Sequence, residues 1–403
     1  MDLRARRAAA ADDVDRRPVR RLSVLALALA ALALAGCGGD PSPKLLGHEV
    51  ELPKGWTASV FARLEQPRWL LWTPQKTLLV SQPRAGTITE LSEDGKEQHV
   101  LISGLTQPQG MAFDGDTLYV AESDAIVKYA WNGGELGPQE TVIDGLPDLD
   151  PDGDDVHRWK SVVVGPDHQL YLPLPSSTNA GLADLQMDPP RGTVAQVDPQ
   201  TGELTIWATG VRNGEGLDFA PDGSLWTAVN NRDNIVNPQT GEVEQSYVND
   251  HPPEEVAKLW KGRDLGWPTC NPEPDSDTFT PDAQTNPDGR LRSCDDLAPI
   301  EVRLPAHNAP LGLHFVAAGE LGDLPAGATL ALHGSWNSRP PKPPGVVFLP
   351  WEDGTLQQPI DLLRGFQLSD NERWGRPVDA VVGPDGALYV SDDQANAIYR
   401  LEP

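Results

Sequence analysis

A short pattern that recurs along the chain constrains its fold more than any other feature. Each copy has apolar residues, then a turn of the Pro-Asp-Gly type, then a strand-like run of apolar and aromatic residues. Proline pre-sets the first turn dihedral and glycine accepts positive φ, so each copy predicts a β-hairpin. Five clear copies and a degenerate sixth occur at residues 70–80, 111–120, 164–172, 219–226, 382–390 and, for the degenerate one, 313–332.

Widely spaced, strand-rich repeats predict an all-β fold, a six-bladed β-propeller, rather than a helical solenoid. Further strand-like runs between the copies would supply the next strand of each blade. Residues 56–61 and 397–401 would share one blade and so remove an exposed sheet edge. Helical periodicity is nearly absent, and only residues 253–259 indicate a short helix. We expect one propeller domain over residues 48–403, with its main insertion at about 237–306.

The N-terminus has the pattern of an export signal. Arginines precede an apolar run at residues 22–35, which is too short to span a bilayer comfortably. Residues 34–37, Leu-Ala-Gly-Cys, resemble the lipobox of bacterial lipoproteins. The resemblance implies a signal peptide at 1–36, a lipid on Cys37 and a tether at 37–47. The protein would then be anchored by its lipid on the periplasmic side of a bacterial membrane. The alternative is an ordinary signal peptide that a cysteine happens to follow.

The charge of the chain restricts its partners. Residues 1–36 carry seven basic and four acidic side chains, so the remainder has a net charge of −30. Such a chain repels nucleic acid and anionic lipid surfaces. We therefore expect no nucleic-acid partner, and contact with a membrane only through the lipid.

Two cysteines remain once Cys37 is assigned to lipid. In an oxidising compartment, Cys270 and Cys294 would form a disulfide; the alternative is two free thiols. The chain has no Cys-x-x-Cys-His sequence for a covalent haem and no Cys/His cluster spaced for zinc.

A series of motifs carries a family resemblance. They lie, in order, at residues 210–213, 229–234, 265–268, 307–312, 333–337 and 375–379. In this order they resemble the glucose/sorbosone dehydrogenases, which are six-bladed propellers that depend on pyrroloquinoline quinone (PQQ). His-Gly-Ser-Trp-Asn at 333–337 and Gly-Arg-Pro-Val-Asp at 375–379 favour the sorbosone branch. The resemblance implies PQQ and Ca²⁺ as cofactors, oxidation of an aldose or sugar aldehyde at C1, and electrons leaving to an external acceptor.

The resemblance also implies roles for particular residues. His157 would be the base that takes the C1 hydroxyl proton while hydride passes to the quinone, in agreement with imidazole's titration near neutral pH. Without the resemblance, His157 would be interpreted as a histidine of a surface loop. Cofactor-binding side chains, which must meet three carboxylates, would be Arg212, Asn213, Arg376 and Arg339, with Lys342 as the alternative to Arg339. The backbone carbonyls of Asn231 and Arg232 would bind Ca²⁺, which prefers oxygen ligands.

The chain departs from the glucose enzymes of this family at two positions. They have Asp before the base and Gln near the Arg-Asn pair, where this chain has Val156 and Glu215. The loop at 172–178 also differs, although Asn179 stands where the family has an asparagine. These differences favour a substrate other than glucose.

Several readings stay open. The acidic segment 148–155 begins like a calcium loop but has Trp159 where the bidentate Glu belongs, so it is either a second calcium site or a solvated loop. Alternative functions are a calcium-dependent lactonase-type hydrolase and a non-catalytic binding propeller. His307 and His333 would line the pocket. The other histidines would be surface or packing residues: His48, His99, His168, His251 and His314.

Overall fold

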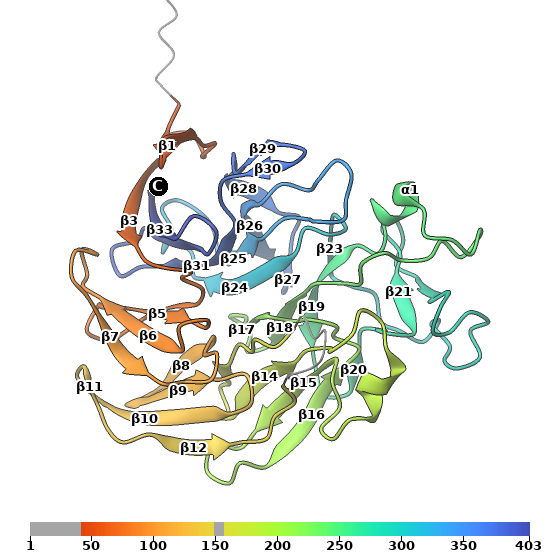
Figure 1. Ribbon diagram of the computed structural model, residues 1–403, viewed down its shortest axis with the longest axis horizontal. Helices are drawn as coiled ribbons and strands as arrows, with labels where there is room; N and C mark the ends of the chain where they lie inside the picture. The colour runs from red at the N-terminus through yellow and green to blue at the C-terminus, as the bar shows by residue number, and fades with distance from the viewer. Residues whose placement is uncertain (1–41, 149–156) are drawn as a thin grey trace, which may run out of the picture. The chain divides into compact units, whose positions relative to one another are not determined.

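The computed structural model describes residues 42–148 and 157–403 (Figure 1). The predicted signal peptide, Cys37, Val156 and most of the acidic segment 148–155 lie outside the described residues. Within the described ranges, no helix has the length and apolar character needed to cross a membrane.

The described chain forms six blades, which confirms the predicted propeller. Each of the first three blades begins with a strand of the recurrent pattern. Blade 1 contains β4 (Leu70–Trp72), β5 (Leu78–Gln82), β6 (Thr87–Leu91) and β7 (Gln98–Ser103). Blade 2 contains β8 (Met111–Asp114), β9 (Thr117–Ala121), β10 (Ile126–Asn132), β11 (Glu135–Leu136) and β12 (Glu140–Ile143). Blade 3 contains β13 (Val163–Val164), β14 (Leu170–Leu174), β15 (Thr193–Val197), β16 (Leu204–Thr209) and, in parallel, β20 (Arg263–Asp264).

The last three blades repeat the plan. Blade 4 contains β17 (Gly216–Phe219), β18 (Leu225–Val229), β19 (Glu254–Leu259) and β23 (Val302–Leu304). Blade 5 contains β24 (Pro310–Val316), β25 (Gly327–Leu332), β26 (Gly345–Glu352), β27 (Thr355–Leu356) and β28 (Ile360–Leu363). Blade 6 contains β31 (Pro377–Val382), β32 (Leu388–Asp392), β33 (Ala397–Glu402) and β3 (Thr57–Arg63).

The two ends of the described chain close the ring, as predicted. β3 pairs antiparallel with β33, and Ala58 lies opposite Leu401 (Figure 1). The outer edge of β33 is therefore covered by a strand from the other end of the chain, which protects it from edge-to-edge association. Closure thus depends on a pairing between residues more than 330 positions apart.

Blade 4 corrects the sequence-based assignment of residues 253–259. The run Glu-Glu-Val-Ala-Lys-Leu suits a helix by propensity, yet it forms β19 between β18 and β23. Burial between two strands overrides such propensities. The segment 237–306 is therefore not one insertion, because it contains two strands of blade 4.

The additional chain in this segment comes as two excursions that flank β19. The first holds the short helix α1 (Gln245–Val248), and the second holds β20 and the hairpin of β21 (Cys270–Pro272) and β22 (Phe279–Pro281). The predicted disulfide between Cys270 and Cys294 is present in the second excursion. Small elements elsewhere are the hairpins β1 (Lys44–Leu45) with β2 (His48–Glu49) and β29 (Gln367–Ser369) with β30 (Glu372–Arg373), and the 3-10 turn η1 (Leu182–Gln186).

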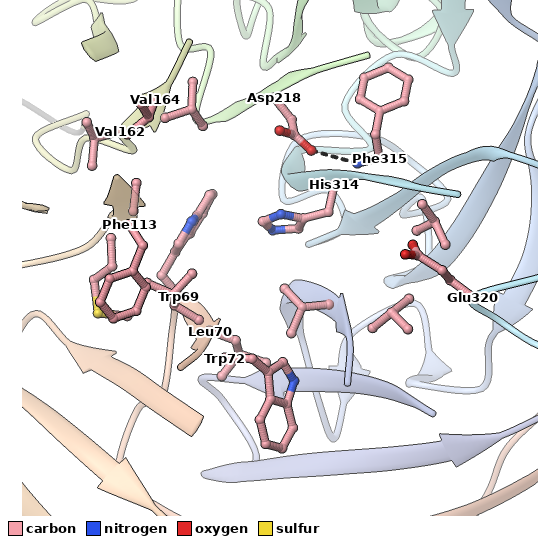
Figure 2. A pocket seen from close by; sticks show the side chains of 17 residues that line it. Trp69, Leu70, Trp72, Phe113, Val162, Val164, Asp218, His314, Phe315 and Glu320 are labelled. Atoms are coloured by element: carbon pink, nitrogen blue, oxygen red, sulfur yellow. Dashed lines mark hydrogen bonds between the residues drawn. The ribbon is translucent and has the colours of Figure 1, made fainter. Parts of the chain in front are cut away.

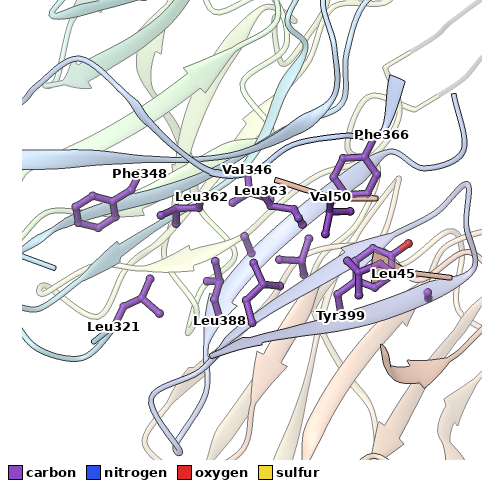
Figure 3. Packing of buried hydrophobic residues seen from close by; sticks show 14 of the residues in the cluster. Leu45, Val50, Leu321, Val346, Phe348, Leu362, Leu363, Phe366, Leu388 and Tyr399 are labelled. Carbon is purple, nitrogen blue, oxygen red and sulfur yellow. The ribbon is translucent and has the colours of Figure 1, made fainter. Parts of the chain in front are cut away.

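The hydrophobic core lies between neighbouring blades. Figure 3 shows the cluster where blades 5 and 6 meet, with Phe348, Leu388 and Tyr399 buried together. Leu45 and Val50, from the segment before β3, are buried in the same cluster. Burying each such side chain contributes roughly 1.5–3 kcal/mol. The N-terminal segment of the described chain is thus fixed to the ring by packing as well as by strand pairing.

The first strand of each blade faces the central channel, and these strands approach closely. A Cβ atom on Gly312 of β24 would lie 2.0 Å from Oδ1 of Asp379 in β31, so no larger residue fits there. Buried carboxylates also join neighbouring blades. Asp379 accepts a hydrogen bond from the backbone N–H of Leu70 (2.9 Å), and Asp218 accepts one from Phe315 (2.6 Å). These contacts hold the first strands in place and therefore also the segments that enter them.

Candidate active site

The segments that precede the first strands gather polar side chains at one end of the channel. His157 lies before β13, Arg212 before β17, His307 before β24 and Arg376 before β31. With the loops that follow β18 and β25, they line a cavity of about 110 Å³. The sequence alone predicted three of these four residues as site residues and His307 as a pocket residue, so the fold brings together positions up to 219 residues apart.

His157 is held as a neutral imidazole. Its Nδ1 atom lies 3.1 Å from the hydroxyl oxygen and 3.2 Å from the carbonyl oxygen of Ser176, a buried residue that the sequence did not single out. Burial lowers the pKa of His157 well below 6.5, and the charges of Arg212 and Arg191 lower it further. If Nδ1 donates its proton to the carbonyl oxygen, the lone pair of the ring is on Nε2. A neutral imidazole is the form that accepts a proton.

Arg212 is buried at the wall of the cavity, and its guanidinium group is fixed by backbone oxygens. It donates to the carbonyl oxygens of Asn179 (3.1 Å), Asn230 (3.2 Å) and Asn231 (2.7 Å), and to the side chain of Asn179 (3.0 Å). Asp233 lies 3.5 Å away. Arg212 therefore presents a positive charge from a rigid position, and it also joins the loops of blades 3 and 4.

Asn213 and Arg232 are buried but do not line the cavity. The amide nitrogen of Asn213 lies 3.3 Å from Glu215, and its Oδ1 atom is buried without a hydrogen-bond partner among the described residues. The side chain of Arg232 pairs with Asp282 and Gln284 of the second excursion. The side chain of Arg232 thus anchors that excursion, and only its backbone remains a candidate for cation binding.

Two buried glutamates support the loop that carries Asn231. Glu254 accepts the backbone N–H of Asn231 (2.5 Å) and also that of Ala309 (3.1 Å), and Glu255 accepts from the Asn231 side chain (2.8 Å). Burial raises the pKa of Glu254 to about 7. Glu254 also lines the cavity. The sequence missed both glutamates because the segment was read as a helix.

His307, which also lines the cavity, is held in place by contacts with two other segments of the chain. Its Nε2 lies 2.6 Å from the carbonyl oxygen of Val248, and its Nδ1 lies 3.5 Å from Asp233. Burial acts to lower the pKa of His307, but Asp233 and Glu254 together raise it above its usual value. His307 therefore lies beside two acidic groups that line the same cavity, Asp233 and Glu254.

Arg376 is a half-buried cation without a close carboxylate among the described residues. Its side chain donates to the carbonyl oxygens of His333 (2.9 Å) and Gly334 (3.3 Å), and no carboxylate oxygen of the described residues lies within 4.0 Å of it. Burial lowers the pKa of Arg376 to about 10, and Arg373 and Arg68 contribute to the shift. A desolvated cation of this kind is stabilised by an anionic ligand.

Arg339 and Lys342 are not brought to the cavity. Arg339 is exposed and donates to the backbone oxygens of Trp336 (2.9 Å) and Ser338 (2.8 Å), while Lys342 lies 3.9 Å from Asp250. Arg373, which the sequence did not single out, donates to the carbonyl oxygen of the lining residue Ser335 (2.5 Å). The prolines at 340–344 displace the predicted cations from this wall.

A buried ionic network lies beneath the cavity and crosses the channel. Arg68 pairs with Glu215 (3.0 Å) and Asp393 (2.8 Å) and donates to Gln109 (2.7 Å). Asp393 lies 3.0 Å from His333. Burial lowers the pKa of His333 to about 4, so this histidine is neutral. Glu215, which stands where the glucose enzymes have Gln, is thus ion-paired with Arg68 within this network.

A further prediction concerns Asp392, which positions Arg376 by accepting its backbone N–H (2.9 Å). Burial raises the pKa of Asp392 from 3.8 to about 6. Because its pKa is raised in the folded state, Asp392 binds its proton more tightly in the folded protein than in the unfolded chain. Its contribution to the free energy of unfolding is therefore fully present below pH 3.8 and is lost as pH rises through 6. We expect Asp392→Asn, which can keep the bond to Tyr399, to gain about 3 kcal/mol of unfolding free energy over the wild type between pH 4 and 7.

Urea unfolding of both proteins at the two pH values measures this gain. Asp353→Asn, an exposed position with φ 52° that asparagine tolerates, is the control. An equal difference between wild type and Asp392→Asn at both pH values would contradict the prediction.

The residues present fit both implied cofactors. PQQ carries three carboxylates, and the cavity offers two cations, the buried Arg212 and the half-buried Arg376. At about 110 Å³ the cavity is smaller than usual ligand pockets of roughly 300–1,000 Å³, so the quinone must also contact the mouth, where Trp336 is 63% exposed. For Ca²⁺, one lone pair of the Asn231 carbonyl oxygen accepts from Arg212 and the other remains. Among the described residues, no three His, Cys, Asp or Glu side chains are grouped as ligands for one ion.

Comparison with known proteins identifies the family. The family model described as TrAA12-like matches residues 50–403, which is the whole propeller. The chain belongs to the TrAA12-like family. It is 24% identical to the pyrroloquinoline quinone-dependent pyranose dehydrogenase of Coprinopsis cinerea, over 91% of this chain. The chain spans 56% of the length of that relative.

Solved structures with the same fold agree with this assignment. The PQQ domain of that Coprinopsis cinerea enzyme, in its holo form, has a TM-score of 0.74 at 20% identity, covering 91% of this chain and 99% of its own. The PQQ-bound aldose sugar dehydrogenase of Streptomyces coelicolor has a TM-score of 0.58 at 17% identity, covering 87% of this chain and 99% of its own. The predicted resemblance to PQQ-dependent sugar dehydrogenases is thereby confirmed for this TrAA12-like chain.

Proposed function

We propose that this TrAA12-like protein is a PQQ- and calcium-dependent dehydrogenase that oxidises an aldose or sugar aldehyde at C1. One observation carries the proposal. The neutral imidazole of His157 shares a small cavity with the buried Arg212 and with Arg376, a half-buried cation that no carboxylate of the described residues pairs within 4.0 Å. A proton acceptor beside cations for an anionic cofactor is the arrangement that a quinone-dependent oxidation requires. Its relatives named as PQQ-dependent sugar dehydrogenases support the same conclusion.

In this mechanism the chain's own residues bind, orient and deprotonate. Arg212 and Arg376 would hold carboxylates of the cofactor, and the carbonyl oxygens of Asn231 and Arg232 would hold Ca²⁺. When bound, PQQ supplies the two-electron acceptor for the hydride that leaves C1. His157 would take the proton of the C1 hydroxyl group, which an aldose has as its cyclic hemiacetal and a sugar aldehyde has as its hydrate, and loss of this proton makes loss of the hydride favourable. Ser176 keeps the ring of His157 in the required orientation.

Reconstitution tests the proposal. The metal-free protein would be mixed with PQQ and Ca²⁺, and dye reduction measured with a panel of aldoses and sugar aldehydes, sorbosone among them. We expect reduction only when both cofactors are present, with electrons passing to the external dye. Failure of PQQ to bind at micromolar concentration would overturn the proposal. Hydrolysis of lactones without the quinone would instead favour the lactonase alternative, and neither activity would favour a binding propeller.

We also propose that the protein is exported and held at the membrane by a lipid on Cys37. The sequence of residues 1–37 supports this location. Cys37→Ser should move the protein from the membrane fraction to the soluble fraction of the periplasm, and centrifugation of fractionated cells measures the change. A wild-type protein that is already soluble in this assay would contradict the lipid anchor.

A further inference from the structure

A second cavity lies at the other end of the central channel. It has a volume of about 390 Å³, and residues from the first strands of all six blades line it (Figure 2). The active-site residues precede the first strands, whereas this cavity is lined by residues within them, such as Phe113, Phe315 and Val382. The buried network of Arg68 lies between the two cavities, since Arg68 immediately precedes the lining residue Trp69. We call the second cavity the lower mouth.

The lower mouth is mainly aromatic and aliphatic. Four aromatic rings line it, those of Trp69, Trp72, Phe113 and Phe315, together with several valines. Figure 2 shows His314 in the middle of the cavity, with Trp69 across from it and Asp218 beside it; the ring centroids of Trp69 and His314 are 6.1 Å apart. The sequence had placed His314 among surface or packing residues, because nothing in its neighbourhood indicated that it faces the channel.

The ionisable groups of the lower mouth leave an excess of negative charge. Nε2 of His314 lies 2.6 Å from Oδ1 of the fully buried Asp379. Burial acts to lower the pKa of His314, but Asp379 and Asp218 raise it above its usual value. His314 and Asp379 form a close pair, so His314 does not offset the other carboxylates of the cavity. Asp218 and Glu320 remain, and no lysine or arginine is among the described residues that line the cavity.

Asp218 is a carboxylate without a close cationic partner of its own. Its oxygens accept the backbone N–H groups of Phe219 (2.7 Å) and Phe315 (2.6 Å). Burial raises the pKa of Asp218, while His314 and the two N–H groups act in the opposite direction. A carboxylate held beside aromatic rings is complementary to an organic cation, because the ring faces and the carboxylate attract the same positive charge.

We propose that the lower mouth binds a small organic cation with an apolar body, of the quaternary ammonium type, between the aromatic rings and the carboxylates of Asp218 and Glu320. This site is separate from the proposed active site and does not depend on the dehydrogenase function. Anions are disfavoured there by the same two carboxylates. Neutral apolar molecules lack the electrostatic part of the attraction.

Titration with matched probes tests the proposal on the full chain loaded with PQQ and Ca²⁺. Choline and its uncharged isostere 3,3-dimethyl-1-butanol have the same shape, so their comparison isolates the charge. Binding is measured by calorimetry and by the fluorescence of the tryptophans at the lower mouth. We expect choline to saturate the signal and to bind about tenfold more tightly than the alcohol. Equal binding of both probes, or no saturable binding of choline, would overturn the proposal.

Variants locate the bound cation. Glu320 is exposed at the rim, so Glu320→Lys should leave the fold intact and weaken choline binding by about tenfold or more. Glu352→Lys makes the same change of net charge at an exposed position outside the cavity and should have no effect. If Glu352→Lys weakens binding as much as Glu320→Lys, attraction to the acidic protein as a whole explains the result and the site is rejected.

Discussion

His157→Ala should lower the rate of sugar oxidation by about 10²–10⁴-fold, which is the usual contribution of a positioned proton acceptor. The reason is local: His157 is the neutral imidazole of the cavity, and burial beside Arg212 keeps its pKa well below 6.5. The loss should appear in kcat, measured by dye reduction at saturating sugar. PQQ affinity, measured by absorbance titration, should change little because the cofactor carboxylates are assigned to the arginines.

The same lowered pKa gives a pH dependence with a definite sign. A base acts when it is unprotonated, so activity should persist below pH 6.5 and fall only as His157 becomes protonated at lower pH. Ser176→Ala should weaken the orientation of the ring and reduce kcat less than His157→Ala does. His168→Ala is a suitable control, since His168 is exposed beside Asp114 on the surface. A rate for His157→Ala within a few-fold of the wild type would remove His157 from the mechanism.

Arg376→Met should weaken PQQ binding by about 10- to 100-fold, the equivalent of roughly 1.5–3 kcal/mol for a hydrogen bond to a charged group. Arg376 is half-buried, and only carbonyl oxygens are within hydrogen-bond distance of its guanidinium group among the described residues. Methionine keeps the apolar volume of the side chain and removes the charge. The change is measured as the dissociation constant of PQQ in titrations followed by absorbance, so the result does not depend on turnover.

Arg339→Met is the matched control for this prediction. The sequence proposed Arg339 as a cofactor-binding residue, but its side chain is exposed and lies outside the lining of the cavity. Its replacement should change the PQQ dissociation constant less than twofold, which is about 0.4 kcal/mol. An effect as large as that of Arg376→Met would show that the loop at 336–344 closes on the cofactor, and would restore the assignment made from the sequence.

The fold could be predicted from the sequence because the turn motifs that indicate it are local. Each Pro-Asp-Gly turn determines a hairpin within about ten residues, and six such units indicate a propeller. The closure of β3 on β33 followed from the need to cover a sheet edge. The strand β19 was missed for the opposite reason, since its residues favour a helix locally and only pairing with β18 and β23 makes them a strand.

Only part of the candidate site could be predicted from the sequence. Motif order placed His157, Arg212 and Arg376, and the structure gathers them in one cavity. Nothing in the sequence indicated Ser176, Glu254 or Glu255, because each acts through a contact with a segment that is distant or differently assigned. For Arg339 the motif register was displaced by a run of prolines, and a local count of residues cannot show where such a loop turns.

The sequence by itself predicted the six hairpin units, the closure of the ring and the disulfide, and it singled out three residues that the structure gathers in one cavity, His157, Arg212 and Arg376. Those features depend on turn dihedrals, alternation of apolar residues and residue chemistry, all of which are carried locally by the chain. Only the tertiary structure decided that His157 is neutral, that Arg376 lacks a close carboxylate among the described residues, and that His314 faces a second cavity. Burial and charge arise from residues brought together across blades, so they depend on distances in space that the order of residues does not contain.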